Sequence, residues 1–111
     1  MIASKRTGTI DTLECDVALS KDTDSAFRAC WQQLLTARPP RIVLDMRNIP
    51  LLDSAGLESL LDLKDRCEEV GGMVVLARPN PLCQDILRIN GLNRDFQIYG
   101  DYVQALGSFS K

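Results

Sequence analysis

The sequence is organised around Leu51-Leu52-Asp53-Ser54-Ala55-Gly56-Leu57, where an apolar segment ends and the pattern of a long amphipathic helix begins. The apolar positions of this pattern approach the i, i+3, i+4, i+7 spacing of a helix with one buried face. They are Leu57, Leu60, Leu61, Leu63, Cys67 and Val70. Asp53 and Ser54 therefore stand at a helix start, where a short side-chain oxygen can accept a hydrogen bond from an unpaired backbone N–H. Glycine inside a helix costs about 1 kcal/mol relative to alanine, so we expect a close neighbour to require Gly56.

A short strand precedes this helix start. Residues Arg41–Met46 are rich in aliphatic side chains and follow Pro39-Pro40, which predicts a buried strand. The segment Arg47–Pro50 then interrupts the apolar run. A strand, a short connection and a helix in this order place Ser54 at the carboxyl edge of a sheet, where α/β proteins usually carry their functional groups.

The N-terminal part predicts strand structure followed by a helix. Residues 7–19 alternate loosely between polar and apolar side chains, which predicts one half-buried strand or two short strands. Residues 20–25 supply capping side chains, and a helical stripe from Ala26 to Leu35 ends before Pro39. Asp22 and Asp24 are typical of a helix start and, without a third ligand, do not predict a metal site.

The C-terminal part continues the alternation of strands and helices. Two glycines, Gly71 and Gly72, mark the end of the central helix. The predicted elements that follow are a buried strand at Met73–Ala77, a rigid loop at Arg78–Pro81, a short helix at Leu82–Ile89, a strand at Phe96–Tyr99 and a helix at Tyr102–Phe109. The whole pattern predicts an α/β fold in which helices pack on a sheet.

Length and composition are those of one ordinary domain spanning residues 1–111. Hydrophobic residues make up 45% and charged residues 25%, which are average values for a globular protein with a substantial core. The formal net charge is −2 and no basic cluster is present, which speaks against nucleic acid as a partner. No apolar run approaches the roughly 20 residues of a membrane span, and Met1–Arg6 lacks the apolar part of a signal peptide. We therefore expect a cytoplasmic protein without membrane insertion.

The cysteines and the missing histidine indicate that no metal or cofactor is needed. Cys15, Cys30, Cys67 and Cys83 are scattered without a C-x-x-C pair, so we expect small buried hydrophobic residues. A zinc site is disfavoured because neither paired cysteines nor histidine is available. The phosphate-binding pattern G-x-x-x-x-G-K-[ST] is also absent from the sequence.

The residues do not support enzymatic chemistry. A Ser-His-Asp arrangement is excluded because the chain contains no histidine. On one helix, Ser54 and Lys64 would lie about 15 Å apart at 1.5 Å per residue, too far for a serine–lysine pair. Distance along the chain does not exclude Lys5 or Lys21 as the partner of Ser54, but no motif supports them. Nothing marks two of the 15 acidic residues as a convergent catalytic pair. We therefore expect a protein without catalytic residues that acts by binding.

Four segments, in this order and spacing, resemble the STAS domain of bacterial anti-sigma factor antagonists. They are Ile42–Asp45, Asp53–Leu57, Gly71–Ala77 and Gly91–Phe96. The resemblance is strongest over residues 41–106 and implies a single layer of mixed β-sheet with about four helices packed on it. The N-terminal part resembles the family least, because Val17–Ser20 stands where such domains usually show a Gly-x-Leu-Asp-like element.

The resemblance implies a partner switch controlled at Ser54. In such antagonists the corresponding serine is phosphorylated by an ATP-using serine kinase that is also the anti-sigma factor. The unphosphorylated form binds this kinase and frees the sigma factor, and a PP2C-type phosphatase resets the cycle. The start of a helix can tolerate a phosphate, because its free N–H groups and its dipole favour negative charge. The resemblance also implies a monomer or weak dimer. The partner-binding residues that it implies are Asp53, Ser54, Ala55, Gly56, Leu57 and Glu58.

Two other roles are compatible with a STAS domain. One is the soluble STAS subunit of an ABC-type lipid transporter, which binds an ATPase subunit and need not be phosphorylated. The other is an interaction module of a stressosome-like signalling assembly, which would form a large oligomer. If Ser54 is not a phosphorylation site, it is an ordinary residue of a helix start.

Overall fold

The computed structural model describes residues 1–36 and 39–110. Its strands form one mixed sheet in the order β1-β2-β3-β4-β5, so each strand lies beside its neighbour in sequence. β1 and β2 form an antiparallel hairpin, and every later strand is parallel to the one before it. The strands are β1 (Ile2–Thr7), β2 (Ile10–Cys15), β3 (Arg41–Asp45), β4 (Met73–Ala77) and β5 (Ile98–Tyr99).

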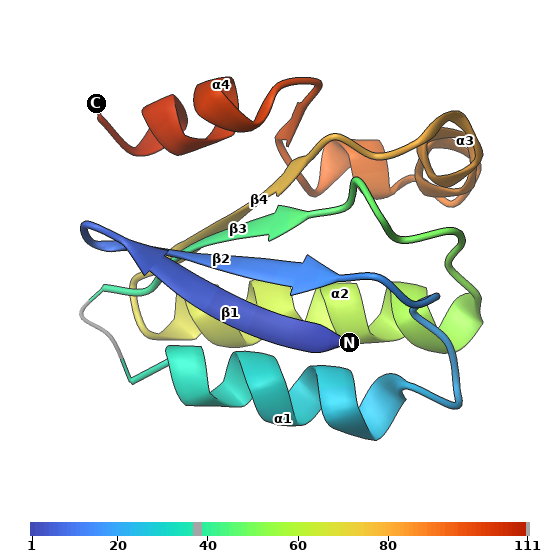
Figure 1. Ribbon diagram of the computed structural model, residues 1–111, viewed down its shortest axis with the longest axis horizontal. Coiled ribbons are helices and arrows are strands. Elements are labelled where there is room, and N and C mark those ends of the chain that lie inside the picture. Colours follow the sequence, from blue (N-terminus) through green and yellow to red (C-terminus); the bar gives the residue numbers. More distant parts are fainter. Residues whose placement is uncertain (37–38, 111) are drawn as a thin grey trace.

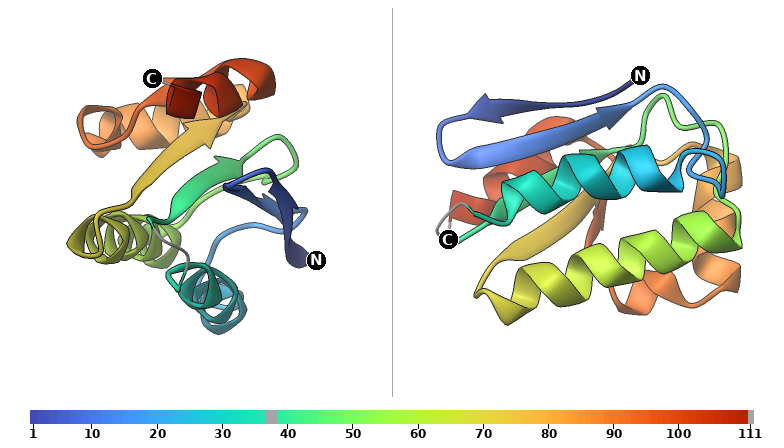
Figure 2. Two further views of the ribbon diagram at one scale, coloured as in Figure 1. Left: turned by 90° about the vertical axis from the view of Figure 1, so that its left-hand side faces the viewer. Right: turned by 90° about the horizontal axis from the view of Figure 1, so that it is seen from below.

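Helices connect the parallel strands and lie on both faces of the sheet (Figure 1). They are α1 (Asp24–Leu34), α2 (Ser54–Glu69), α3 (Pro81–Ile89) and α4 (Tyr102–Gly107), with 3₁₀ turns at Leu92–Arg94 and Ser108–Ser110. α1 and α2 lie side by side on one face, and α4 lies on the opposite face (Figure 2). The predicted single mixed sheet with about four helices is thereby confirmed.

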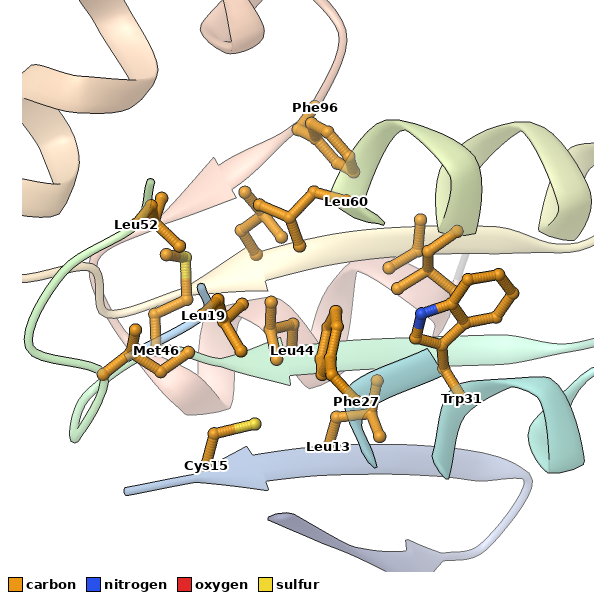
Figure 3. Packing of buried hydrophobic residues seen from close by; sticks show 14 of the residues in the cluster. Leu13, Cys15, Leu19, Phe27, Trp31, Leu44, Met46, Leu52, Leu60 and Phe96 are labelled. Atoms are coloured by element: carbon orange, nitrogen blue, oxygen red, sulfur yellow. The ribbon is translucent and has the colours of Figure 1, made fainter. Parts of the chain in front are cut away.

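Among the described residues, the larger of two hydrophobic clusters lies between the sheet and the helices α1 and α2 (Figure 3). Phe27 and Trp31 enter it from α1, and Leu60 enters it from α2; each of the three is at most 1% exposed. The indole Nε1–H of Trp31 also donates a hydrogen bond to the buried Ser59 hydroxyl of α2, at 3.4 Å. These contacts fix α2, and with it the position of Ser54, against the sheet.

A salt bridge at the carboxyl ends of β3 and β4 supports the opposite face of the sheet. Arg78 donates from Nε to Asp45 Oδ1 (3.2 Å) and from Nη2 to Asp45 Oδ2, and its guanidinium lies 5.2 Å from the centre of the Tyr102 ring. The φ angle of Arg78 is 56°, in the left-handed region that costs a non-glycine residue about 1–2 kcal/mol. The Tyr102 hydroxyl lies 2.7 Å from Thr12 Oγ1, so this network attaches α4 to β2, β3 and β4.

The N-terminal strands lie earlier in the chain than predicted. Strand structure was expected within residues 7–19, whereas β1 occupies Ile2–Thr7 and β2 ends at Cys15. Gly8, at a φ of 62°, forms the turn between them. Ser4–Thr7 is exposed at the edge of the sheet, so the first strand lacks the alternation of apolar residues on which a prediction depends.

Smaller differences occur in the C-terminal half. β5 is limited to Ile98–Tyr99, because the Phe96 N–H donates to the Leu92 carbonyl (3.0 Å) in a helical turn. α3 begins one residue earlier than expected, at Pro81, and Asn80 caps it by accepting a hydrogen bond from the backbone N–H at position 83 (2.7 Å). The last helix ends at Gly107 and continues as a 3₁₀ turn.

The cysteines are free thiols that belong mainly to the core. Cys15, Cys67 and Cys83 are buried, as predicted, whereas Cys30 is half-buried. Burial raises the pKa of the Cys15 thiol to about 12 and that of Cys67 to about 11. These two thiols are therefore neutral at physiological pH and are weak nucleophiles.

Replacing Leu60 with alanine is expected to lower the free energy of unfolding by about 2–5 kcal/mol, because it leaves a cavity under α2. Leu82→Ala provides the control, since the Leu82 side chain is 52% exposed, and its effect should stay within about 0.5 kcal/mol. Urea denaturation followed by circular dichroism measures both changes. Equal losses of stability would contradict the assignment of the core.

Candidate functional site

The predicted site residues, Asp53 to Glu58, run from the end of a loop into the first turns of α2, at the edge of the sheet where the parallel strands end (Figure 1). Ser54 and Glu58 are exposed, whereas Asp53, Ala55 and Leu57 are half-buried. Gly56 is buried. The side chains that extend furthest into solvent are therefore the Ser54 hydroxyl and the Glu58 carboxylate.

The Asp53 carboxylate connects two separate segments of the chain. Its Oδ1 accepts a hydrogen bond from the Gly56 N–H (2.9 Å), which caps α2 as predicted. Its Oδ2 accepts a hydrogen bond from the Lys21 backbone N–H (3.1 Å), which lies between β2 and α1. These hydrogen bonds, first from Gly56 and then from Lys21, hold the pKa of the Asp53 carboxyl below its usual range. Asp53 is therefore ionised at neutral pH. Its carboxylate caps α2 and also links the start of α2 to Lys21, and these two hydrogen bonds are called the Asp53 clamp below.

Two backbone hydrogen bonds extend this clamp to Leu19. The Leu19 N–H donates to the Leu51 carbonyl and the Asp53 N–H donates to the Leu19 carbonyl, each at 3.1 Å. Leu19 and Leu52 form an isolated parallel bridge, and both side chains are at most 4% exposed. The segment that resembles the family least thus supports the start of α2. Local sequence patterns do not reveal this contact, because it joins residues more than 30 positions apart.

Gly56 allows the Leu19 segment to approach the first turn of α2. A Cβ atom at position 56 would lie 2.1 Å from the Leu19 carbonyl oxygen, far inside van der Waals contact. The expectation that a close neighbour requires this glycine is confirmed. The role of Gly56 in the structure is to keep the backbone of α2 beside the backbone of residues 19–21.

Ser54 is the first residue of α2, but Asp53 rather than Ser54 provides the cap. Because the Ser54 side chain is exposed, its hydroxyl is accessible to a modifying enzyme without unfolding of the helix. The nearest acids in sequence are Asp53 and, one helical turn on, Glu58. A phosphate on Ser54 would meet the favourable dipole of the helix start and the opposing charges of these carboxylates.

The exposed face of α2 is acidic, although part of its charge is neutralised. Arg28 of α1 donates to Asp62 Oδ2 (2.7 Å) and to Asp24 Oδ2 (2.9 Å), which adds a polar link between α1 and α2. Lys64 pairs with Glu68 at 3.1 Å. The exposed acids outside these pairs are Glu58, Asp65 and Glu69.

The described residues give little support for a metal site or a membrane-spanning helix. Within residues 1–36 and 39–110, no three cysteine or acidic side chains converge as metal ligands would. In the same part of the chain, every helix is too short or too polar to cross a bilayer. A surface hollow beside α3 is lined by Pro79, Gln84, Asp85, Arg88, Asn93, Ile98 and Gly100. None of these residues belongs to the Asp53–Glu58 segment.

Gly56→Ala is expected to destabilise the protein by about 1–3 kcal/mol, because the added methyl group overpacks against Leu19. Helix propensity alone would predict the opposite sign, a gain of about 1 kcal/mol. Gly107→Ala is the matched control, since a Cβ atom there would meet nothing within 4 Å. Urea denaturation separates the two explanations. A Gly56→Ala variant as stable as wild type would show that Leu19 does not require the glycine.

Asp53→Asn is expected to lower stability at neutral pH, because an amide offers one acceptor oxygen where the carboxylate offers two. The lowered pKa fixes the sign of the pH dependence. The contribution of ionised Asp53 is complete above its unfolded pKa of about 3.9 and is lost as the pH falls through the lower folded value. The difference from wild type should therefore shrink in strong acid. Thermal unfolding between pH 7 and pH 2 measures it, with Asp65→Asn on the same helix as the control; an equal loss in both variants would contradict the clamp.

Comparisons with known proteins identify the fold and the family. The profile of the STAS domain matches residues 2–105. A STAS-domain containing protein of Pseudomonas aeruginosa is 33% identical over 72 residues, which are 65% of this chain and 70% of that protein. The STAS profile begins to match at residue 2 and so includes the N-terminal region, which precedes the segment 41–106 where the resemblance is strongest.

Solved structures share the same fold at low sequence identity. An anti-sigma-factor antagonist (STAS) domain protein from Planctomyces limnophilus superimposes with a TM-score of 0.89 at 16% identity, over 99% of this chain and 98% of that one. The anti-sigma factor antagonist SpoIIAA, in its unphosphorylated form, gives a TM-score of 0.82 at 15% identity, over 99% and 96% of the two chains. SpoIIAA of Bacillus is also known in the phosphorylated form, with a TM-score of 0.74 at 16% identity, over 98% and 99%. From the ordered segments around Asp53-Ser54, the five-stranded sheet and the matched profile, we conclude that the chain belongs to the STAS domain family.

Proposed function

We propose that this STAS domain is an anti-sigma factor antagonist that switches partners through phosphorylation of Ser54. The unphosphorylated protein binds an anti-sigma factor that is also a serine kinase. Phosphorylation of Ser54 by that kinase ends the interaction, and a PP2C-type phosphatase restores it. The protein acts in the cytoplasm by binding, without catalytic residues of its own.

The observation that carries this proposal is an exposed serine on a rigid support. Ser54 lies at the first position of α2, while the backbone on both sides of it is fixed by the Asp53 clamp and by Leu19. A partner that docks on residues 53–58 therefore meets a surface whose shape does not depend on the Ser54 hydroxyl. A change at this hydroxyl can alter binding while the fold persists.

The charge of a phosphate on Ser54 would weaken binding of the partner. Phosphorylation adds about 1.5 to 2 negative charges at neutral pH. Burying such a group in an interface is costly unless the partner supplies compensating charges. The neighbouring Asp53 and Glu58 carboxylates increase the negative potential at the same place. Phosphorylation thus changes the start of α2 from a weakly acidic surface into a strongly anionic one.

The comparisons support this role at the level of the fold. The similar chains include proteins named as anti-sigma factor antagonists, and SpoIIAA has been solved with and without phosphate. At 15–16% identity, these similarities show a shared architecture and no more. The step from the shared fold to phosphorylation of Ser54 is our proposal.

The test compares baits in a pull-down from a native lysate, with captured proteins identified by mass spectrometry. The baits are wild type, Ser54→Ala, Ser54→Asp and Ser25→Asp. Ser25 is the matched control, because it is an exposed serine in the first turn of a different helix, α1. We expect wild type, Ser54→Ala and Ser25→Asp to capture a serine kinase, and Ser54→Asp to bind it about tenfold more weakly, a loss of about 1.4 kcal/mol.

Two outcomes would contradict the proposal. Equal binding of the kinase by wild type and Ser54→Asp would show that the start of α2 is not the control point. Capture of a transporter ATPase by every bait would assign the protein to lipid transport instead. Incubation of the purified kinase with ATP and each variant completes the test, because phosphate should be incorporated in wild type and Ser25→Asp but not in Ser54→Ala.

A further inference from the structure

Lys21 is a cationic residue whose backbone takes part in the Asp53 clamp. Its backbone N–H donates to Asp53 Oδ2 (3.1 Å), so the main chain at Lys21 is held next to the residue that precedes Ser54. The Lys21 side chain is exposed. In the described part of the chain, the ion pairs do not include Lys21. Its exposed ammonium group is therefore not paired with a carboxylate of these residues.

The other charged groups close to Ser54 in the chain or in this clamp are negative. Asp53 precedes the serine, Glu58 follows it by one helical turn, and Asp22 is the exposed neighbour of Lys21. Like charges at this separation repel a phosphate, particularly at low ionic strength. A nearby cation would offset this repulsion, and Lys21 is the cationic residue whose backbone the Asp53 clamp holds.

We propose that the Lys21 ammonium is the counter-ion of a phosphate on Ser54. This inference rests on the proposed phosphorylation of Ser54 and adds a residue of the same chain that pairs with the phosphate. Lysine suits the role, because its ammonium is a compact charge on a flexible stem and binds phosphate without a fixed geometry. The backbone of Lys21 need not move, since its N–H is already held by Asp53.

The pairing gives phosphorylation two effects on the surface. Before phosphorylation, Lys21 presents a positive charge that a partner can contact beside Ser54. Afterwards, the same charge is neutralised while the phosphate adds negative charge. Lys21 also favours the doubly charged form of the phosphate, whose second pKa is ordinarily about 6. The modified site therefore keeps its full negative charge at neutral pH.

The experiment places phosphoserine at position 54 of the full chain during synthesis, so that no kinase is required. The second ionisation of the phosphate is then followed by phosphorus NMR as a function of pH. For Lys21→Ala we expect the second pKa of the phosphate to rise by about 0.3 unit, a size typical of one exposed ion pair. Lys21→Arg should restore the wild-type value, because it restores the cation.

Arg47→Ala is the matched control. Arg47 is an exposed cation in the loop between β3 and α2, at the same edge of the sheet. Its removal should leave the second pKa of the phosphate unchanged. A Lys21→Ala value equal to wild type would overturn the proposal, and so would equal shifts for Arg47→Ala and Lys21→Ala.

The outcome is independent of the test of the proposed function. Lys21→Ala should keep the Asp53 clamp, because the hydrogen bond uses the backbone N–H of residue 21. An unchanged chemical shift of the Gly56 amide verifies this point. If Ser54 is never phosphorylated by a kinase, the proposed function fails in the lysate experiment while the NMR titration still measures the charge beside Ser54.

Discussion

The carboxylate of Asp53, together with two backbone hydrogen bonds at Leu19, holds together two segments that no regular sheet or helix connects. One oxygen satisfies an N–H of the first turn of α2, and the other satisfies an N–H of the segment that leads into α1. A loss of this carboxylate would remove both hydrogen bonds at once and would leave the part-buried Gly56 N–H without its acceptor. The shape of the surface around Ser54 depends on this shared acceptor.

The residues that hold the start of α2 in place are different from the residues that it exposes to solvent. Leu19, Leu52 and Leu60 lie beneath the start of α2 and are nearly inaccessible to water, whereas Ser54 and Glu58 lie above it and are exposed. The proposed phosphorylation of Ser54 would therefore add charge without removing apolar contacts. On the opposite face of the sheet, the contacts of Arg78 with Asp45 and Tyr102 hold α4 in place. The two faces are stabilised by different means, one mainly by apolar packing and the other partly by a charged network.

Much of this architecture could be predicted from local patterns in the sequence. The stripe from Leu57 to Cys67 predicted α2, the aliphatic runs predicted β3 and β4, and the order Asp-Ser-x-Gly predicted the capped helix start. Such features are readable because each depends on residues close together in the chain. Gly56 was also readable as a close approach, since glycine inside a helix requires a reason.

What could not be predicted depends on distant or backbone contacts. β1 carries mostly exposed polar residues, so it shows no alternation, and β5 has only two residues. The bridge between Leu19 and Leu52 joins segments on either side of α1 and β3. The hydrogen bond from Lys21 uses a backbone N–H, which every residue except proline possesses, so the residue type at position 21 gave no signal.

The order of the strands along the chain has a consequence for synthesis on the ribosome. Every strand after β1 pairs with the strand made just before it. Each newly emerged strand and helix can therefore add to an existing edge of the sheet, and none of these strands has to wait unpaired for a partner encoded near the C-terminus.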